Sequence, residues 1–191
     1  MNAFSPLPTS KSLFTVGHST RSLDELIRIL HASNVSILAD VRSYPKSRTN
    51  PQFTSDAIAD VLPQHGVEYV WLQKLGGRRE GLGRKSKNTC WKNQSFRNYA
   101  DYMETQPFLE GFADLAGLIR KGTVAIMCAE ALYWRCHRSM ISDFAKSRGF
   151  RVMHLIGDNQ WSEHKYSECA RIVNGALTYR VNSEISDFVT R

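Results

Sequence analysis

Short apolar runs alternate with amphipathic segments along most of the chain. The runs are four to eight residues long and rich in Val, Ile and Leu. Continuous apolar runs of this length are typical of strands buried on both faces of a parallel sheet. They lie at residues 13–16, 35–42, 67–72, 123–127 and 151–156, and a weaker run at 177–181 predicts an edge strand.

The segments between these runs carry apolar residues at the spacing of one helix face. The first segment begins with Ser22 and has Glu25 three residues later, which predicts Ser22 as the helix N-cap. Pro63 predicts an irregular last turn in the second segment. The predicted helices cover residues 23–30, 55–65, 95–103, 107–119, 140–148 and 166–173.

Alternating strands and helices with short connections predict a parallel sheet that is covered by helices. We therefore predict a single α/β domain over residues 13–191, with a mostly parallel sheet of about five strands and helices on both faces. A chain of 191 residues is long enough for one such domain and short for two. Residues 1–12 contain two prolines and several serines, which predicts a flexible leader.

Polar residues end or follow several of the predicted strands. Right-handed crossovers place the carboxyl ends of parallel strands at one edge of a sheet, so we expect these residues to lie together although they are far apart in sequence. Ligands of open α/β sheets bind at this edge. The residues are His18, Asp40, Arg42, Cys128 and His154.

The stretch 123–149 is the densest in reactive side chains. Two thiols, a carboxylate, an imidazole and a guanidinium lie between the end of a predicted strand and the start of a predicted helix. A helix N-terminus favours negative charge, so this position suits an anionic group. The residues are Cys128, Glu130, Cys136, His137 and Arg138.

The net charge of +7 is concentrated in residues 74–97, which hold eight Lys or Arg and one Glu. A local basic patch predicts an anionic partner, although a solubilising loop explains the same residues equally well. The hydroxyls and cations of the loop 43–51 are also suited to phosphate or carboxylate contacts. The candidate substrate-binding residues are Arg42, Ser47, Arg48, Arg78, Arg79 and Arg138.

No apolar stretch approaches the roughly 18 residues that span a membrane, and the N-terminus lacks the pattern of a signal peptide. We therefore expect a cytoplasmic protein that has no membrane partner. In a reducing cytosol the cysteines are expected to be free thiols or metal ligands rather than disulfides, and two of them, Cys90 and Cys169, are expected to be unconnected with the site. The four are Cys90, Cys128, Cys136 and Cys169.

Many of these positions belong to longer motifs: Gly17-His18-Ser19, Asp40-Val41-Arg42, Pro45-x-Ser47, Leu75-Gly76-Gly77 with the basic loop, Tyr99 to Met103, Met127 to Glu130, and Trp134 to Ser139. Over about residues 14–164 the chain resembles the uncharacterised family known as domain of unknown function 488. The resemblance implies a recurring α/β domain with a site at these positions, and it implies no settled reaction. The family commonly has a proline where this chain has Tyr133.

The leading hypothesis is an enzyme that uses a thiol on a phosphate-bearing or nucleic-acid-like substrate. A cysteine near cations and a helix N-terminus has a lowered pKa and becomes a nucleophilic thiolate. A histidine would serve as acid or base, a carboxylate would orient it or take a proton, and arginines would bind an oxyanion. Two plainer interpretations are an Asp40–Arg42 pair that only holds the arginine, and a Cys128 that is only a core residue. The candidate catalytic residues are Cys128, Glu130, Cys136, His137, His18 and Asp40.

Two alternatives use the same residues differently. A transition-metal site, with zinc or iron, would draw its ligands from Cys128, Cys136, His137, His18 and His154, although no C-x2-C spacing is present. A non-catalytic nucleic-acid-binding protein would use the basic loop 74–97 to follow a phosphate backbone, with Trp91 and Phe96 stacking on bases.

Overall fold

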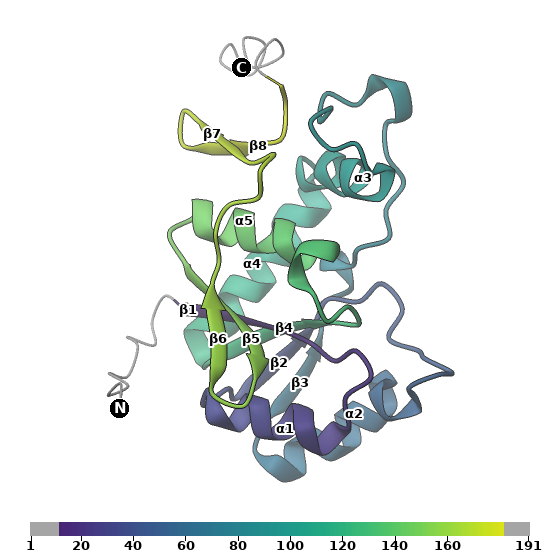
Figure 1. Cartoon of the computed structure of the whole chain (residues 1–191), viewed down its shortest axis with the longest axis vertical. Helices are drawn as coiled ribbons and strands as arrows, with labels where there is room; N and C mark the ends of the chain where they lie inside the picture. The colour runs from purple at the N-terminus through teal and green to yellow at the C-terminus, as the bar shows by residue number, and fades with distance from the viewer. Residues whose placement is uncertain (1–11, 182–191) are drawn as a thin grey trace.

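A computed structural model describes residues 12–181, and its centre is a six-stranded sheet (Figure 1). The strand order is β3-β2-β4-β1-β5-β6. The first five strands of the chain are parallel, and β6 pairs antiparallel with β5. The strands are β1 (Ser12–Gly17), β2 (Ile37–Asp40), β3 (Glu68–Trp71), β4 (Val124–Cys128), β5 (Arg151–Gly157) and β6 (Gln160–Glu163).

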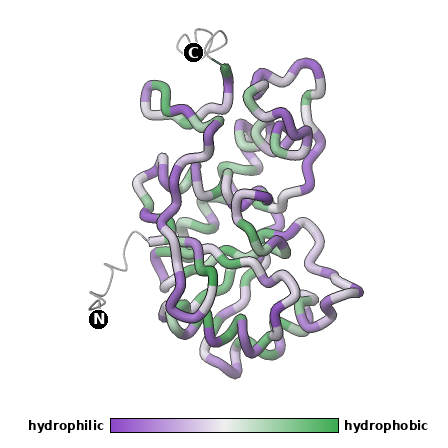
Figure 2. The backbone as a smooth tube through the Cα atoms, viewed as in Figure 1, coloured by the Kyte–Doolittle hydropathy of each residue, from purple (hydrophilic) through white to green (hydrophobic). Residues whose placement is uncertain are grey.

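Helices cover both faces of this sheet, as the alternation of elements predicts. The helices α1 (Leu23–Ala32) and α2 (Ser55–Val61) pack on one face. On the other face lie α3 (Gln94–Met103), α4 (Gln106–Lys121) and α5 (Arg138–Ser147). Figure 2 shows that the apolar stretches of the backbone gather in the middle of the molecule, where these layers meet.

Short 3-10 helices connect several of these elements. They are η2 (Pro51–Phe53), η3 (Leu62–His65), η4 (Gln73–Leu75), η5 (Gly83–Lys85) and η6 (Tyr133–Arg135). The helix predicted over residues 55–65 is α helix as far as Val61 and 3-10 helix from Leu62, because Pro63 cannot donate an intrahelical hydrogen bond. At α1 the hydroxyl of Ser22 accepts a hydrogen bond from the backbone N–H of Glu25, which confirms the predicted N-cap.

The predictions for the C-terminal part were wrong in two respects. The segment predicted as a helix over 166–173 is a turn followed by β7 (Arg171–Val173). Its partner is β8 (Ala176–Thr178), so the run at 177–181 belongs to a separate two-stranded sheet and is not an edge of the main sheet. Tertiary bonds explain the difference, because Ser167 binds a buried carboxylate on α5 and Cys169 is held by a disulfide.

The sequence patterns also missed β6, which makes the sheet six-stranded. Three of its four residues are exposed, so it carries no buried apolar run. The leader predicted over residues 1–12 lies outside the described residues except for Ser12, which begins β1. No helix between residues 12 and 181 has the length and apolar character that a membrane crossing requires.

A disulfide joins Cys90 to Cys169, which corrects the expectation that all four cysteines are thiols. The two residues are 79 positions apart, and their Cα atoms are 5.6 Å apart. The disulfide connects the end of the basic loop to the segment before β7. Cys128 and Cys136 remain free thiols.

Candidate functional site

The carboxyl ends of β1 and β4 meet at the point where the sheet reverses its winding. These strands are neighbours, but the helix that follows β1 covers one face and the helix that follows β4 covers the other. The backbone N–H of His18 donates to the carbonyl of Cys128 at 3.0 Å, and that of Ser19 donates to Ala129 at 2.9 Å. His18 and Cys128 therefore lie at one edge of the sheet, where ligands of such folds bind.

Gly17 lets the chain after β1 pass close to the chain after β4. A Cβ atom at this position would lie 2.0 Å from the carbonyl oxygen of Glu130 and 2.9 Å from the Cα of Ala131. These are backbone atoms, so they cannot yield as the end of a flexible side chain would. The glycine that the sequence places before His18 therefore sets the position of the 129–131 loop.

Gly17→Ala is expected to lower the free energy of unfolding by about 1–3 kcal/mol, because the added methyl group must push the 129–131 backbone aside. Urea denaturation measures the change. Gly117→Ala on α4 is the matched control, since its Cβ would meet only the end of Arg120 at 3.7 Å. That substitution is expected to raise stability by up to about 1 kcal/mol. Equal effects of the two substitutions would contradict the close approach at Gly17.

The two free thiols lie against each other at the end of β4. The Sγ atoms of Cys128 and Cys136 are 3.0 Å apart. Both the backbone N–H and the Nε–H of Arg138 point to Cys136 Sγ at 3.4 Å, whereas the Cys128 sulfur lies 3.8 Å from the carbonyl of Glu130. Cys136 lies two residues before α5, and because the backbone N–H of Arg138, the first residue of α5, points to its sulfur, that sulfur faces the positive end of the helix.

Arg138 is buried, with 1% of its surface exposed. Its Nη2 donates to the carbonyls of Glu130 at 2.6 Å and Ala131 at 3.2 Å. Among residues 12–181, no carboxylate forms an ion pair with it. A buried guanidinium requires a nearby anion, and the sulfur of Cys136 stands in that position.

The surroundings push the pKa values of the two thiols apart. Burial opposes ionisation of Cys136, but the hydrogen bond from Cys128, His137 and the charge of Arg138 outweigh it and hold the pKa well below the usual range. Burial and the neighbouring Cys136 raise the pKa of Cys128 well above its usual value. These opposite directions favour Cys136 as the thiol that ionises first and Cys128 as the one that keeps its proton.

His137 is held in a fixed orientation beside Cys136. Its Nε2 donates to the carbonyl of Val41 at 2.7 Å, and its ring packs edge-on against Tyr99 with centroids 5.2 Å apart. A Cβ atom on Gly77 would lie 2.4 Å from His137 Nδ1, so only glycine fits there without moving the imidazole. This contact gives a physical role to the Gly76-Gly77 pair in the sequence.

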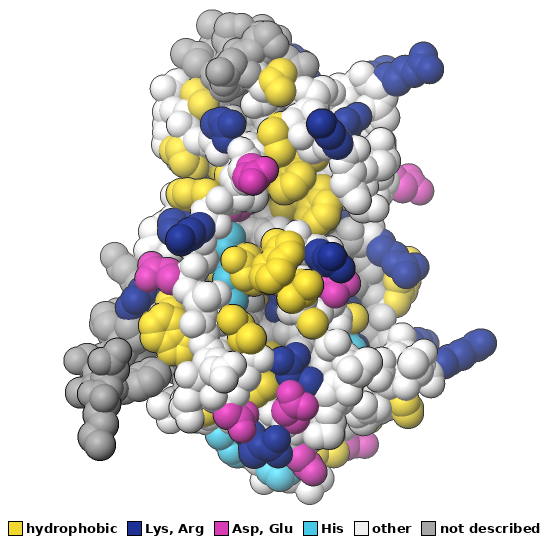
Figure 3. Space-filling model, viewed as in Figure 1, with side chains coloured by type: hydrophobic (Ala, Val, Ile, Leu, Met, Phe, Trp, Pro, Cys, Tyr) yellow, Lys and Arg dark blue, Asp and Glu magenta, His cyan; other side chains and the backbone are white. Residues whose placement is uncertain are grey.

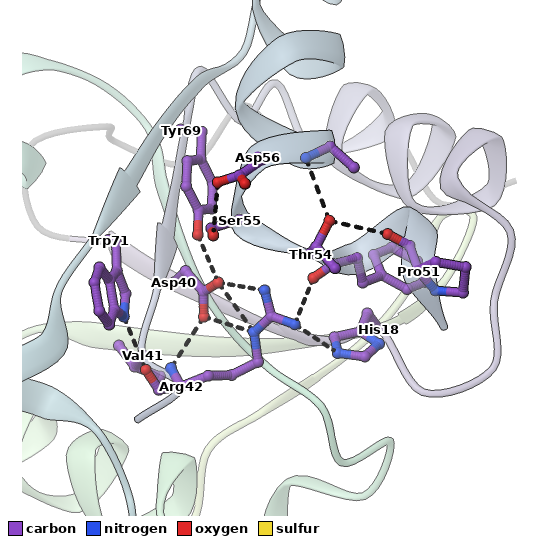
Figure 4. A network of polar contacts seen from close by, with 12 residues as sticks. His18, Asp40, Val41, Arg42, Pro51, Thr54, Ser55, Asp56, Tyr69 and Trp71 are labelled. Atoms are coloured by element: carbon purple, nitrogen blue, oxygen red, sulfur yellow. Dashed lines mark hydrogen bonds and ion pairs between the residues drawn. The ribbon is translucent and has the colours of Figure 1, made fainter. Parts of the chain in front are cut away.

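Asp40 and Arg42 form a closed buried network (Figure 4). The Asp40 carboxylate accepts from the backbone N–H and Nε of Arg42 at 2.9–3.0 Å and from the hydroxyl of Tyr69 at 2.8 Å. The other end of the guanidinium donates to the carbonyl of Phe53 at 2.7 Å. The Asp40–Arg42 pair therefore holds the arginine in place, which was one of the two interpretations of these residues from the sequence.

His18 belongs to the same network and lies behind the thiols. Its Nε2 accepts from Arg42 at 3.2 Å, its Nδ1 donates to the carbonyl of Ser19 at 2.9 Å, and its ring stacks on Phe53. Burial and then the Arg42 charge lower the pKa of His18 to about 4. The imidazole is therefore neutral at pH 7 and both of its nitrogens are already bonded, which suits a role in positioning.

A pocket of about 560 Å³ opens in front of the thiols. Its walls come from the ends of β2 and β4, from the loop after β3 and from α3. Cys128 and Cys136 line it together with His137 and the exposed side chain of Glu130. The wall also contains aromatic and cationic side chains: Tyr44, Phe96 and Tyr99, and Arg42, Lys46, Arg78 and Arg135.

The space-filling view shows hydrophobic side chains gathered near the middle of one face, with Lys and Arg side chains around them (Figure 3). The loop between the two thiols contributes exposed apolar surface. Trp134 is 57% exposed and Leu132 is 37% exposed. The next residue, Arg135, lines the pocket, as does Lys46 after β2. Neither Lys46 nor Arg135 was among the predicted binding residues, although Lys46 lies within the motif Pro45-x-Ser47 and Arg135 within the motif Trp134 to Ser139.

Several predicted binding residues lie outside the pocket or already form bonds within the protein. Ser47 accepts the backbone N–H of Asn50 at 2.9 Å in a turn, and Arg48 is exposed outside the pocket. Arg79 donates to the carbonyls of Gly76, Gln73 and Lys74 and lies over the ring of Tyr102, which makes it part of the scaffold. Arg78 remains exposed at the pocket.

Further cations of the basic loop form bonds within the protein. Lys74 pairs with Glu110 at 2.9 Å, and Arg97 donates twice to the carbonyl of Trp91. The rings of Trp91 and Phe96 stack on each other with centroids 4.9 Å apart. They therefore cover each other, which leaves less aromatic surface for bases than the sequence led us to expect.

His154 does not reach the pocket. Its ring stacks on Tyr133 of the loop between the thiols, with centroids 3.4 Å apart, and lies one layer behind it. Its nitrogens contact Thr15 at 2.8 Å and His164 at 2.9 Å. His164 in turn contacts Asp143 at 2.9 Å. Sequence patterns singled out His154 but did not join it to His164 and Asp143, because the three residues come from β5, from the segment after β6 and from α5.

No cluster of three or more His, Cys, Asp or Glu side chains arranged to hold a metal ion occurs within residues 12–181. The five candidate ligands divide into separate groups. His18 is bonded to Arg42 and His154 to His164, whereas His137, whose Nε2 is bonded to a backbone carbonyl, lies beside the two thiols.

Comparison with known proteins identifies one family. Neither the curated proteins nor the solved structures gave a match. A family model matches residues 22–145, which include both thiols, Asp40–Arg42 and the start of α5. Because this match covers more than half of the chain, the protein belongs to the family described as domain of unknown function DUF488.

Proposed function

We propose that the protein is a thiol-dependent enzyme whose nucleophile is the Cys136 thiolate and whose substrate carries an anionic group. One observation carries the proposal: the buried guanidinium of Arg138, without a carboxylate partner among the described residues, faces the sulfur of Cys136. A thiolate so placed is a nucleophile near neutral pH. The open pocket in front of it admits a small molecule.

The cations at the pocket support an anionic substrate, and a phosphate-bearing one is the class we expect. Lys46, Arg78 and Arg135 line the pocket and are exposed, so they are free to turn toward a ligand. The aromatic wall would hold an apolar or planar part of the same molecule. In this proposal Arg42 and Asp40 position the wall, and His137 exchanges protons with the reacting groups.

The remaining roles follow from exposure. Glu130 stands exposed at the pocket and would take up a proton released there, whereas Cys128 is 3% exposed and contacts the nucleophile. A nucleophilic thiol works only when it is reduced, so we propose a cytoplasmic location even though the separate Cys90–Cys169 pair is a disulfide.

Alkylation of Cys136 by iodoacetamide tests the proposed thiolate. The rate is expected to reach half of its maximum at a pH well below that of a free cysteine, because Arg138 and the thiol of Cys128 stabilise the charged form. A free cysteine reaches that point at about pH 8.5. Mass spectrometry of peptides reads the modification at each cysteine.

Two variants sharpen this test. Cys136→Ser should abolish the fast phase, and Cys128→Ala should keep it but shift it to higher pH, since one hydrogen bond to the thiolate is lost. Inorganic pyrophosphate should slow the alkylation, and Arg78→Ala should weaken that protection. A half-maximal rate at or above pH 8.5 in the unmodified protein would remove the thiolate from the proposal.

A further inference from the structure

The second thiol has no role in a simple nucleophilic mechanism, yet it touches the nucleophile. Cys128 Sγ lies 3.0 Å from Cys136 Sγ, and a disulfide requires about 2.05 Å. A shift of about one ångström by either sulfur therefore closes the bond. Cys128 is the last residue of a buried strand, whereas Cys136 stands in the short segment between η6 and α5. The segment that bears Cys136 is the part that would move.

The two sulfurs differ in what they can reach. Cys136 is partly exposed at the pocket, while Cys128 is 3% exposed beneath it. A substrate in the pocket therefore meets Cys136 first. The group that Cys128 is placed to attack is whatever has become attached to the sulfur of Cys136.

We propose that Cys136 and Cys128 are the attacking and resolving thiols of a reductase that acts on small disulfides bearing negative charges. This inference rests on the proposed function, since it uses Cys136 as the nucleophile, and it names the electrophilic atom of the substrate as sulfur. The aromatic and cationic lining of the pocket suits an organic disulfide that carries phosphate or carboxylate groups.

The reaction balances in two steps. The Cys136 thiolate attacks one sulfur of the substrate R–S–S–R, a mixed disulfide forms, and RS⁻ leaves. Cys128 then attacks the Cys136 sulfur and loses its proton, and the second RS group leaves as RSH once it takes up that proton. The substrate gains two electrons and the protein loses two, with a Cys128–Cys136 disulfide as the product. A dithiol reductant restores both thiols for the next turnover.

The experiment uses glutathione disulfide as the probe and the full-length protein, with the reductant removed. The unmodified protein should release two equivalents of glutathione and gain a Cys128–Cys136 disulfide, which peptide mass spectrometry locates. Cys128→Ala should release one equivalent and keep glutathione on Cys136. Cys136→Ala should release none. Cys90→Ala/Cys169→Ala, which removes the other disulfide, is the matched control and should still release two equivalents.

The proposed preference for anionic disulfides is tested separately. Cystamine, a cationic disulfide, should react at least about tenfold more slowly than glutathione disulfide in low salt, because pocket cations repel it. Lys46→Ala/Arg78→Ala should reduce that difference. Equal rates for the two disulfides in the unmodified protein would overturn the anionic preference.

The outcomes separate the two proposals. Stable glutathione on Cys136 of the unmodified protein, without a Cys128–Cys136 disulfide, would overturn the reductase and leave the nucleophile standing. A Cys136 that reacts with neither glutathione disulfide nor iodoacetamide would overturn both. Two equivalents of glutathione released by Cys128→Ala would also overturn the resolving role.

Discussion

Replacing Asp143 with alanine is expected to lower the free energy of unfolding by about 3–5 kcal/mol, the usual cost of removing one partner from a buried charged network. Asp143 lies on α5 and is completely buried. Its carboxylate contacts His164 Nε2 at 2.9 Å and accepts from the backbone and hydroxyl of Ser167 and from the hydroxyl of Tyr179, at 2.7–3.0 Å. Without it, the donors of His164 and Tyr179 would remain buried and unbonded.

The hydrogen bonds of this network run in one direction. His164 donates from Nε2 to the carboxylate, so its Nδ1 is free to accept from His154 Nε2. The Nδ1 atom of His154 then accepts from the hydroxyl of Thr15. One carboxylate thus sets the tautomer of two imidazoles, and through the Tyr133 ring stacked on His154 it supports the loop between the thiols.

Urea denaturation of the full-length protein measures this prediction. Asp114→Ala is the matched control, because Asp114 lies exposed on α4, and its loss should change stability by no more than about 0.5 kcal/mol. Asp143→Asn keeps the shape of the side chain, and its loss in free energy of unfolding should lie between the losses of Asp143→Ala and Asp114→Ala. A single hydrogen bond contributes about 1 kcal/mol to stability. If the free energy of unfolding of Asp143→Ala lay within about 1 kcal/mol of the parent's, the whole network would therefore contribute little.

Between pH 7 and pH 5, the titration of two buried histidines is expected to lower the free energy of unfolding by about 4 kcal/mol, roughly 2 kcal/mol for each. Burial and the Arg42 charge lower the pKa of His18 to about 4. Burial, then His164 and Arg138, lower the pKa of His154 to about 3. Both folded values lie below the value of about 6.5 in the unfolded chain.

The sign follows from proton binding. Between the folded and unfolded pKa values, the unfolded chain binds protons that the folded protein does not, so falling pH favours unfolding. The full stability is therefore present above pH 6.5 and declines as the pH falls toward 4 and then 3. Neither imidazole can take a proton without losing the hydrogen bond that it accepts, from Arg42 or Thr15.

Denaturation curves at several pH values between 7 and 5 measure the slope. His154→Gln should remove about 2 kcal/mol of the decline, since one of the two buried imidazoles is gone. His31→Gln is the control, because His31 is exposed at the end of α1, and it should leave the slope unchanged. A His154→Gln protein with the parent's full slope would assign the acid sensitivity to other groups.

Local patterns were sufficient for most of the secondary structure. Four of the five apolar runs became the mostly buried strands β1, β2, β4 and β5, since a strand buried on both faces needs consecutive apolar residues. The run at 67–72 became the edge strand β3, whose residues are exposed or half-buried. Ser22 and Pro63 marked a helix start and an irregular turn because capping and proline geometry depend on neighbours in sequence. Right-handed crossovers also brought His18 and Cys128 to one edge, as predicted.

The same patterns failed where contacts between distant segments determine the secondary structure. Residues 166–173 have helical spacing, but the bonds of Ser167 to Asp143 and of Cys169 to Cys90 hold them in a turn and a short strand. The strand β6 is mostly exposed and pairs only because the chain turns back on β5. Local propensity is a weak preference that such tertiary bonds override.

By itself, the sequence determined that this chain forms a helix-covered parallel sheet and that two thiols, an imidazole and an arginine gather where one strand ends. Those features depend on periodicity and on spacing along a single stretch of chain. Only the tertiary structure decided the strand order, the 3.0 Å contact of the two sulfurs, the burial of Arg138 and the pairing of Cys90 with Cys169. Each of these depends on how separate elements pack, and packing between distant segments leaves no period in the sequence.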